Sequence, residues 1–111
     1  AYPDVRYNAA VRLAQRGDEA AVPVLLEMLD PNEQAGVEAE KEKQMQGFKR
    51  ALITINALRA AGQLAEKNPS ANLTPLKEAI DKLLASDVTP ETRIEATAAL
   101  SHLEKRAAAT P

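Results

Sequence analysis

Residues 8–16, Asn-Ala-Ala-Val-Arg-Leu-Ala-Gln-Arg, return at residues 59–67 as Arg-Ala-Ala-Gly-Gln-Leu-Ala-Glu-Lys. A weaker third copy follows at residues 95–103, which is 87 positions after the first copy. Two repeats of about 43 residues fit this shift, and that length is typical of helical repeats that stack into a solenoid. The sequence therefore predicts an all-α stack, and such stacks commonly offer an extended surface to a partner.

Composition limits the classes of function that this chain can perform. It has 111 residues, enough for one domain with its own core, and no cysteine, which excludes disulfides and thiolate metal sites. Its net charge is −2 and its aromatic content is 3%, so neither polyanion binding nor base stacking is favoured. No apolar run approaches the roughly 18 residues of a membrane span. We expect a soluble chain without membrane insertion, in the cytoplasm rather than the periplasm, although the absence of cysteine fits both compartments.

Apolar residues at helical spacing, bounded by Gly and Pro, predict five helices. We expect them near residues 4–16, 19–30, 38–67, 74–86 and 90–106. Gly17 is expected as the left-handed residue that ends the first helix, and Asp18 as the cap of the second. Thr74 and Thr89, each followed by Pro, are expected to be N-caps of the last two helices. No segment alternates with period two for long enough to make a strand.

The same spacing predicts which side chains are buried. The first helix is expected to carry an apolar stripe made of Val5, Ala9, Ala10, Leu13 and Ala14. Four residues are expected to be buried at equivalent places in successive repeats: Leu13, Leu26, Leu64 and Ile80. The third helix is apolar on two sides, so we expect it to be buried between neighbours. One side carries Met45, Phe48, Leu52 and Ile55, and the other carries Ile53, Ala57, Ala60 and Leu64.

The charged stretch at residues 33–47 departs from a plain repeat. Glu38 precedes Lys41, and Glu40 precedes Lys43, by three positions each, which is the spacing of ion pairs along a helix. Most of this stretch is therefore predicted to be an N-terminal extension of the third helix, beginning near residue 38.

Residues 9–30, Ala-Ala-Val-Arg-Leu-Ala-Gln-Arg-Gly-Asp-Glu-Ala-Ala-Val-Pro-Val-Leu-Leu-Glu-Met-Leu-Asp, resemble the bacterial HEAT repeats of the type also found in phycobilisome lyases. The shared features are an Ala/Leu helix, a Gly-Asp turn, Ala-Val-Pro, and a Leu-rich helix that ends in Asp. Residues 4–6, Asp-Val-Arg, and 91–93, Glu-Thr-Arg, are similar to the acidic opening of such repeats. The resemblance implies a right-handed α-α superhelix of about two and a half helix pairs, five helices in all. We expect residues 1–111 to form one such domain, part of a longer protein.

Residues able to perform catalysis or hold a metal are scarce. The chain has one histidine, His102, expected as an ordinary surface residue on the fifth helix. HEAT-type iron hydroxylases carry His-Glu pairs, whereas His102 is followed by Leu103. The four glycines are scattered, so no phosphate-binding loop is predicted. We therefore expect no enzymatic activity, no metal and no cofactor.

The exposed side of the second and fourth helices is the candidate binding surface, because second helices line the concave side in families of this kind. The candidate partner-binding residues are Pro23, Glu27, Asp30, Lys77, Asp81 and Lys82. Mixed charge around small apolar residues suits a protein or peptide partner better than a nucleic acid. A merely solvated face is the alternative for these residues. The sequence thus predicts a non-catalytic protein-interaction or scaffolding module.

Three other functions stay open at this stage. The chain could be an accessory part of a chromophore-lyase-type HEAT enzyme, or a structural spacer inside a larger protein. A nucleic-acid-binding HEAT-like domain is less favoured, because such a surface needs more than the short basic face of Arg6, Arg12 and Arg16. The outer flank of the fifth helix, around Ile94 and Ala98, has no following helix to cover it, which predicts weak homodimer formation there.

Overall fold

The computed structural model describes residues 3–33 and 42–109 of the chain. These ranges contain five α-helices, one short 3-10 turn and no strand, which confirms the predicted all-α class. The elements are α1 (Pro3–Gln15), η1 (Glu19–Ala21), α2 (Val22–Leu29), α3 (Lys43–Lys67), α4 (Thr74–Leu84) and α5 (Pro90–Ala109). The handedness of the superhelix stays a prediction.

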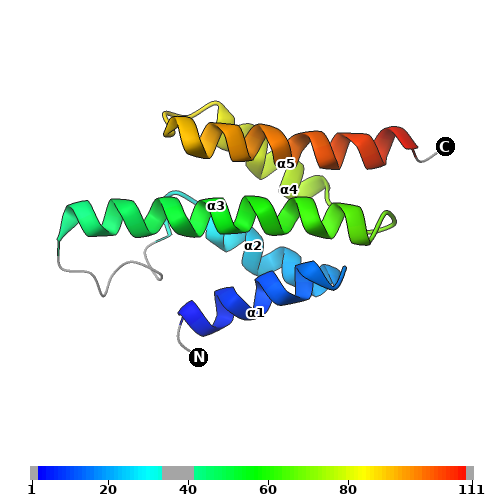
Figure 1. Cartoon of the computed structure of the whole chain (residues 1–111), viewed down its shortest axis with the longest axis horizontal. Coiled ribbons are helices and arrows are strands. Elements are labelled where there is room, and N and C mark those ends of the chain that lie inside the picture. The colour runs from blue at the N-terminus through cyan, green and yellow to red at the C-terminus, as the bar shows by residue number, and fades with distance from the viewer. Residues whose placement is uncertain (1–2, 34–41, 110–111) are drawn as a thin grey trace.

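The helices form two layers (Figure 1). α1, α3 and α5 lie side by side in the first layer, and α3 packs against both of the others. α2 and α4 form the second layer, where they contact each other; α2 also contacts α1 and α3, and α4 contacts α5. Alternation of the two layers along the chain is the arrangement that stacked helix pairs produce.

The core consists of large aliphatic side chains between the layers and small ones within the first layer. The largest fully buried side chains are Leu25, Met28, Leu58, Leu64, Leu76 and Ile80. Gly62, Ala98 and Ala99 line the contact between α3 and α5, and such small residues let the two helix backbones approach closely. Leu64 and Ile80 are thus buried as predicted. Leu13 and Leu26 are only half-buried, because α1 and α2 lie at the end of the stack.

The turn between α1 and η1 has the predicted left-handed glycine, whereas Asp18 caps η1 and not α2, which begins at Val22. Gly17 has a φ of 80°, and the Asp18 carboxylate accepts a hydrogen bond from the Ala20 N–H at 2.9 Å. A side chain on Gly17 would be strained by this φ, and its Cβ would lie 3.0 Å from the Cβ of Lys67. Asn68 then donates from Nδ2 to the Gly17 carbonyl at 2.9 Å, so the turn is fixed against the end of α3.

The two Thr-Pro sequences behave differently from each other. Thr89 is the predicted cap, since its Oγ1 accepts a hydrogen bond from the Thr92 N–H at 3.2 Å. The prediction for Thr74 is wrong: it is the first residue of α4, Leu73 is the N-cap, and the Thr74 N–H donates to Asn72 Oδ1 at 3.3 Å. The side chain two residues before the helix has taken the capping role that Thr74 was expected to play.

The start of α3 and the exposure of its first turns also correct the sequence prediction. Glu42 is extended and α3 begins at Lys43, while residues 38–41 of the expected extension lie outside the described ranges. Met45, Phe48 and Leu52 are exposed rather than buried, because this end of α3 extends past the first residues of α1 and α5 (Figure 1). Val5 and Ala9 are exposed for a related reason, since none of the helices in residues 3–33 and 42–109 packs on the outer side of α1.

Candidate functional site

A groove between α2 and α4 is the candidate site. Its volume is about 470 Å³, and it lies in the second layer, where the sequence places the partner-binding face. The lining residues from α2 and the turn after it are Leu26, Leu29, Asp30, Pro31 and Asn32. Those from α4 and its C-terminal end are Pro75, Glu78, Ala79, Lys82, Leu83 and Ser86.

The groove has an apolar floor and a charged rim. Leu29 and Leu83 are buried at its base, and Leu26 and Ala79 are half-buried on its walls. Asp30, Glu78 and Lys82 are exposed at the edge. A concave apolar surface with a few charged groups around it can accept an apolar side chain of a partner and orient the charges beside it.

The wall formed by the turn after α2 is fixed by local hydrogen bonds. The Asp30 carboxylate accepts from the Asn32 N–H at 2.9 Å, which closes an Asx-type turn around Pro31. Asp30 is also the extended residue that ends α2. The position of this wall is therefore set by the sequence Asp-Pro-Asn itself.

Arg50 of α3 holds the same wall from behind. Its Nη1 donates to the Glu33 carbonyl and its Nη2 donates to the Met28 carbonyl, both at 2.6 Å. Met28 lies in the last turn of α2, where carbonyl groups have no partner within the helix. Burial lowers the pKa of Arg50 below its ordinary value. Arg50 is thus a positioning residue that joins the groove wall to the core, and the sequence analysis missed it because its partners are backbone atoms 17 and 22 residues away.

The six residues predicted for the site do not gather in one place. Asp30 and Lys82 line the groove, whereas the other four do not. Glu27 forms an ion pair with Arg6 of α1, and this hydrogen bond raises the pKa of Arg6.

The remaining three lie on exposed parts of their helices. Lys77 and Asp81 pair with each other along α4, with their charged atoms 3.7 Å apart. Pro23 is exposed in the first turn of α2. The prediction missed other groove residues, such as Glu78 and Ala79. They line the groove because α2 and α4 pack side by side, which the spacing within one helix does not indicate.

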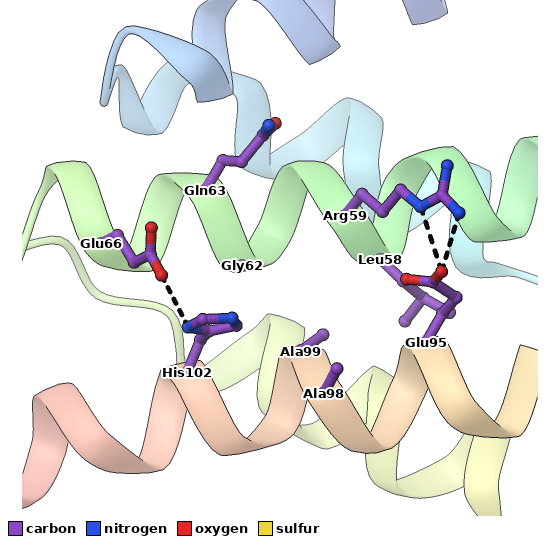
Figure 2. A pocket seen from close by; sticks show the side chains of 9 residues that line it. All are labelled: Leu58, Arg59, Gly62, Gln63, Glu66, Glu95, Ala98, Ala99 and His102. Atoms are coloured by element: carbon purple, nitrogen blue, oxygen red, sulfur yellow. Dashed lines mark hydrogen bonds and ion pairs between the residues drawn. The ribbon is translucent and has the colours of Figure 1, made fainter.

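A second cleft lies between α3 and α5 in the first layer (Figure 2). Figure 2 shows a polar contact at each end of it: the ion pair of Arg59 with Glu95, at 2.8 Å, and the contact of His102 Nδ1 with Glu66 Oε1, at 2.8 Å. The hydrogen bond to Glu95 raises the pKa of Arg59. Because its polar side chains already contact each other across the two helices and its volume is only about 230 Å³, this cleft is better suited to joining α3 to α5 than to binding a ligand.

His102 is a half-exposed residue at the edge of that cleft. Its ring lies over the backbone of Gly62, where an added Cβ would be 3.2 Å from His102 Cδ2. Within residues 3–33 and 42–109, no group of three or more His, Asp or Glu side chains is arranged to hold a metal ion. No helix in these ranges combines the length and apolar character needed to cross a membrane.

Comparison with known proteins identifies the first repeat. Residues 5–31 match the family described as PBS lyase HEAT-like repeat, which confirms the resemblance seen in residues 9–30. The matched segment contains α1, η1 and α2, together with the turn that forms one wall of the groove. Comparisons with curated proteins and with solved structures gave no match.

Proposed function

Because residues 5–31 form a PBS lyase HEAT-like repeat within an all-helical stack, we propose that this chain is a protein-interaction module that binds a partner in the groove between α2 and α4. The observation that carries the proposal is the combination of apolar floor, charged rim and rigid wall in one concavity. Helical repeats commonly bind protein or peptide partners through the surface of one helix layer. A nucleic acid is a poorer fit, because the rim includes two acidic side chains, Asp30 and Glu78.

We also propose that the module is not itself an enzyme, because of the side chains that line the groove. The single histidine, His102, contacts Glu66 away from the groove, so the groove side chains that could act as nucleophiles, Asp30, Glu78, Lys82 and Ser86, have no histidine base beside them. Ser86 Oγ donates to the Leu83 carbonyl at 2.7 Å, so its proton is engaged in ending α4. An accessory role in a chromophore lyase has the support of the repeat match, and binding of a linear tetrapyrrole by the purified chain would favour it.

Affinity capture with matched variants tests the proposed surface. The immobilised chain is used to isolate partners from an extract of the native cells, and the affinity of each partner is then measured for the wild type and three variants. Ala79→Glu places a charge on the groove wall, and Lys82→Glu reverses an exposed rim charge. Thr97→Glu changes an exposed position of α5 and serves as the control.

The proposal expects at least a tenfold loss of affinity for the two groove variants and no change for the control. Thermal melts establish that each variant is folded, and Lys82→Glu keeps the test valid if Ala79→Glu is destabilised. A partner that binds all three variants as well as it binds the wild type would contradict the proposal.

A further inference from the structure

Three exposed large apolar side chains share one face at the beginning of α3. Met45, Phe48 and Leu52 are 47%, 62% and 46% exposed, and their spacing of three and then four residues places them in one stripe. Single exposed apolar residues are ordinary on protein surfaces, whereas contiguous ones mark surfaces that contact something. The stripe belongs to the first layer, so it is separate from the groove between α2 and α4.

The stripe lies where a second helix can reach it. The ion pair between Lys49 and Asp4, at 3.6 Å, places the first turn of α1 beside the middle of the stripe. The ion pair between Arg59 and Glu95 places the start of α5 farther along α3, beyond Leu52. Figure 1 shows the same offset, with the beginning of α3 extending past both neighbouring helices.

We propose that this stripe pairs with the same stripe of a second copy of the chain, with the two α3 helices antiparallel about a twofold axis beside Phe48. Met45 lies three residues before Phe48, and Leu52 lies four residues after it. In an antiparallel pair, Met45 of each copy therefore meets Leu52 of the other, while the two Phe48 rings meet at the axis. A twofold interface requires a self-complementary surface of this kind.

The charges beside the stripe also favour a second copy. Lys49 and Asp4 present one positive and one negative group at its edge. The twofold rotation brings an identical pair from the other copy, so each Lys49 can approach an Asp4 across the interface. A strongly acidic or basic partner would instead be matched by an edge of a single charge sign.

The small size of the stripe sets the strength of the association. Stable complexes bury about 1,600 Å² in total, and three side chains from each copy cover only part of such an area. The dimer is accordingly weak and depends on protein concentration. Because the groove between α2 and α4 stays open in it, each copy can still bind a partner.

Sedimentation equilibrium of the whole chain at increasing concentration tests the pairing. The average mass of the wild type should rise above the 11.9 kDa of one chain, and Phe48→Glu should weaken the association at least tenfold. Ile94→Glu is the control, since Ile94 is 69% exposed on α5 and lies outside the stripe. Loss of association in Ile94→Glu alone would overturn the proposal in favour of the flank of α5, and a wild type that stays monomeric at the highest concentration would overturn it outright.

Single cysteines give an independent readout, because the chain has none of its own. Phe48→Cys should form a disulfide-linked dimer under mild oxidation several times faster than Ile94→Cys, since only the first cysteine lies at the proposed axis. Equal rates for the two variants would contradict the antiparallel pairing even if the wild type dimerises. Neither experiment involves the groove, so failure here leaves the proposed function untouched.

Discussion

Arg50 links the core of the molecule to the surface proposed to bind a partner. It is a half-buried cation of α3, and two of its N–H groups donate to carbonyls at the end of α2 and in the following turn. Hydrogen bonds from a charged group to the backbone are among the stronger ones in proteins. We therefore expect Arg50 to stabilise the position of the groove wall more than any exposed residue of that wall does.

Replacing Arg50 by Met should lower the free energy of unfolding by about 2–3 kcal/mol, because two carbonyls lose a charged donor while the packing volume is kept. Arg59→Met is the matched control: Arg59 pairs with Glu95 on the surface, and loss of an exposed ion pair costs about 0–1 kcal/mol. Urea unfolding of both variants measures the difference. Equal losses in the two variants would show that Arg50 has no special structural role.

Tyr7 gives the molecule a measurable response to alkaline pH. It is 4% exposed, and burial, followed by the charge of Glu27, raises its pKa above the ordinary value of 10.0. The phenol of the unfolded chain therefore ionises first. This contribution to stability is complete below pH 10 and is lost as the pH rises from there through the pKa of the folded state.

The variant Tyr7→Phe should flatten the decline of stability above pH 10, relative to the wild type. At pH 7 its free energy of unfolding should be within about 1 kcal/mol of the wild-type value, because the buried Tyr7 hydroxyl has no hydrogen-bond partner in the described structure. Denaturant unfolding at several pH values provides both comparisons. A parallel decline of the two proteins above pH 10 would contradict the assignment to Tyr7.

Elements of the stack differ in how much their apolar residues contribute. Leu64 and Ile80 are fully buried in α3 and α4, whereas Leu13 and Leu26 are half-buried in α1 and α2. Truncation of Leu64 or Ile80 to Ala should lower the free energy of unfolding by about 2–5 kcal/mol. The same change at Leu13 or Leu26 should lower it distinctly less. Thermal and urea unfolding of the four variants tests this order. Equal losses at all four positions would indicate that another part of the chain covers α1 and α2.

Local signals in the sequence predicted the boundaries of the elements well where one residue fixes the backbone. Gly17 supplies a positive φ that other residues rarely adopt, and the Thr89 hydroxyl caps α5, whereas the same Thr-Pro sequence at Thr74 supplies no such cap. The exposed stripe at Met45 could not be predicted, since helical periodicity shows which face is apolar but not whether a neighbouring helix covers it.

The candidate site could be predicted only at the level of a helix face. Of the six residues expected to bind a partner, Asp30 and Lys82 line the groove, whereas Glu27 pairs with Arg6, a residue 21 positions earlier in the chain. Side chains such as Glu78 enter the groove only because α2 and α4 pack at one particular offset. Sequence spacing within one helix carries no information about that offset, which is decided by the packing of both helices against the first layer.

At the scale of the whole molecule, the two helix layers have different structural roles. The first layer joins α1, α3 and α5 through small buried residues and surface ion pairs, and the second presents the groove. One wall of the groove comes from residues 26–32, all but the last of which lie within the segment that matches the HEAT-like repeat family, and the other wall comes from α4. The groove that we propose as the binding surface therefore forms only when consecutive helix pairs are stacked.

Amide hydrogen exchange of the chain, alone and bound to a captured partner, shows directly whether the partner occupies the groove between α2 and α4. We expect the partner to slow exchange in residues 26–32 and 75–86, on the two sides of the groove, and to leave the exposed positions of α5 unchanged. Slowed exchange confined to α1, α3 and α5, with the groove segments unaffected, would contradict it.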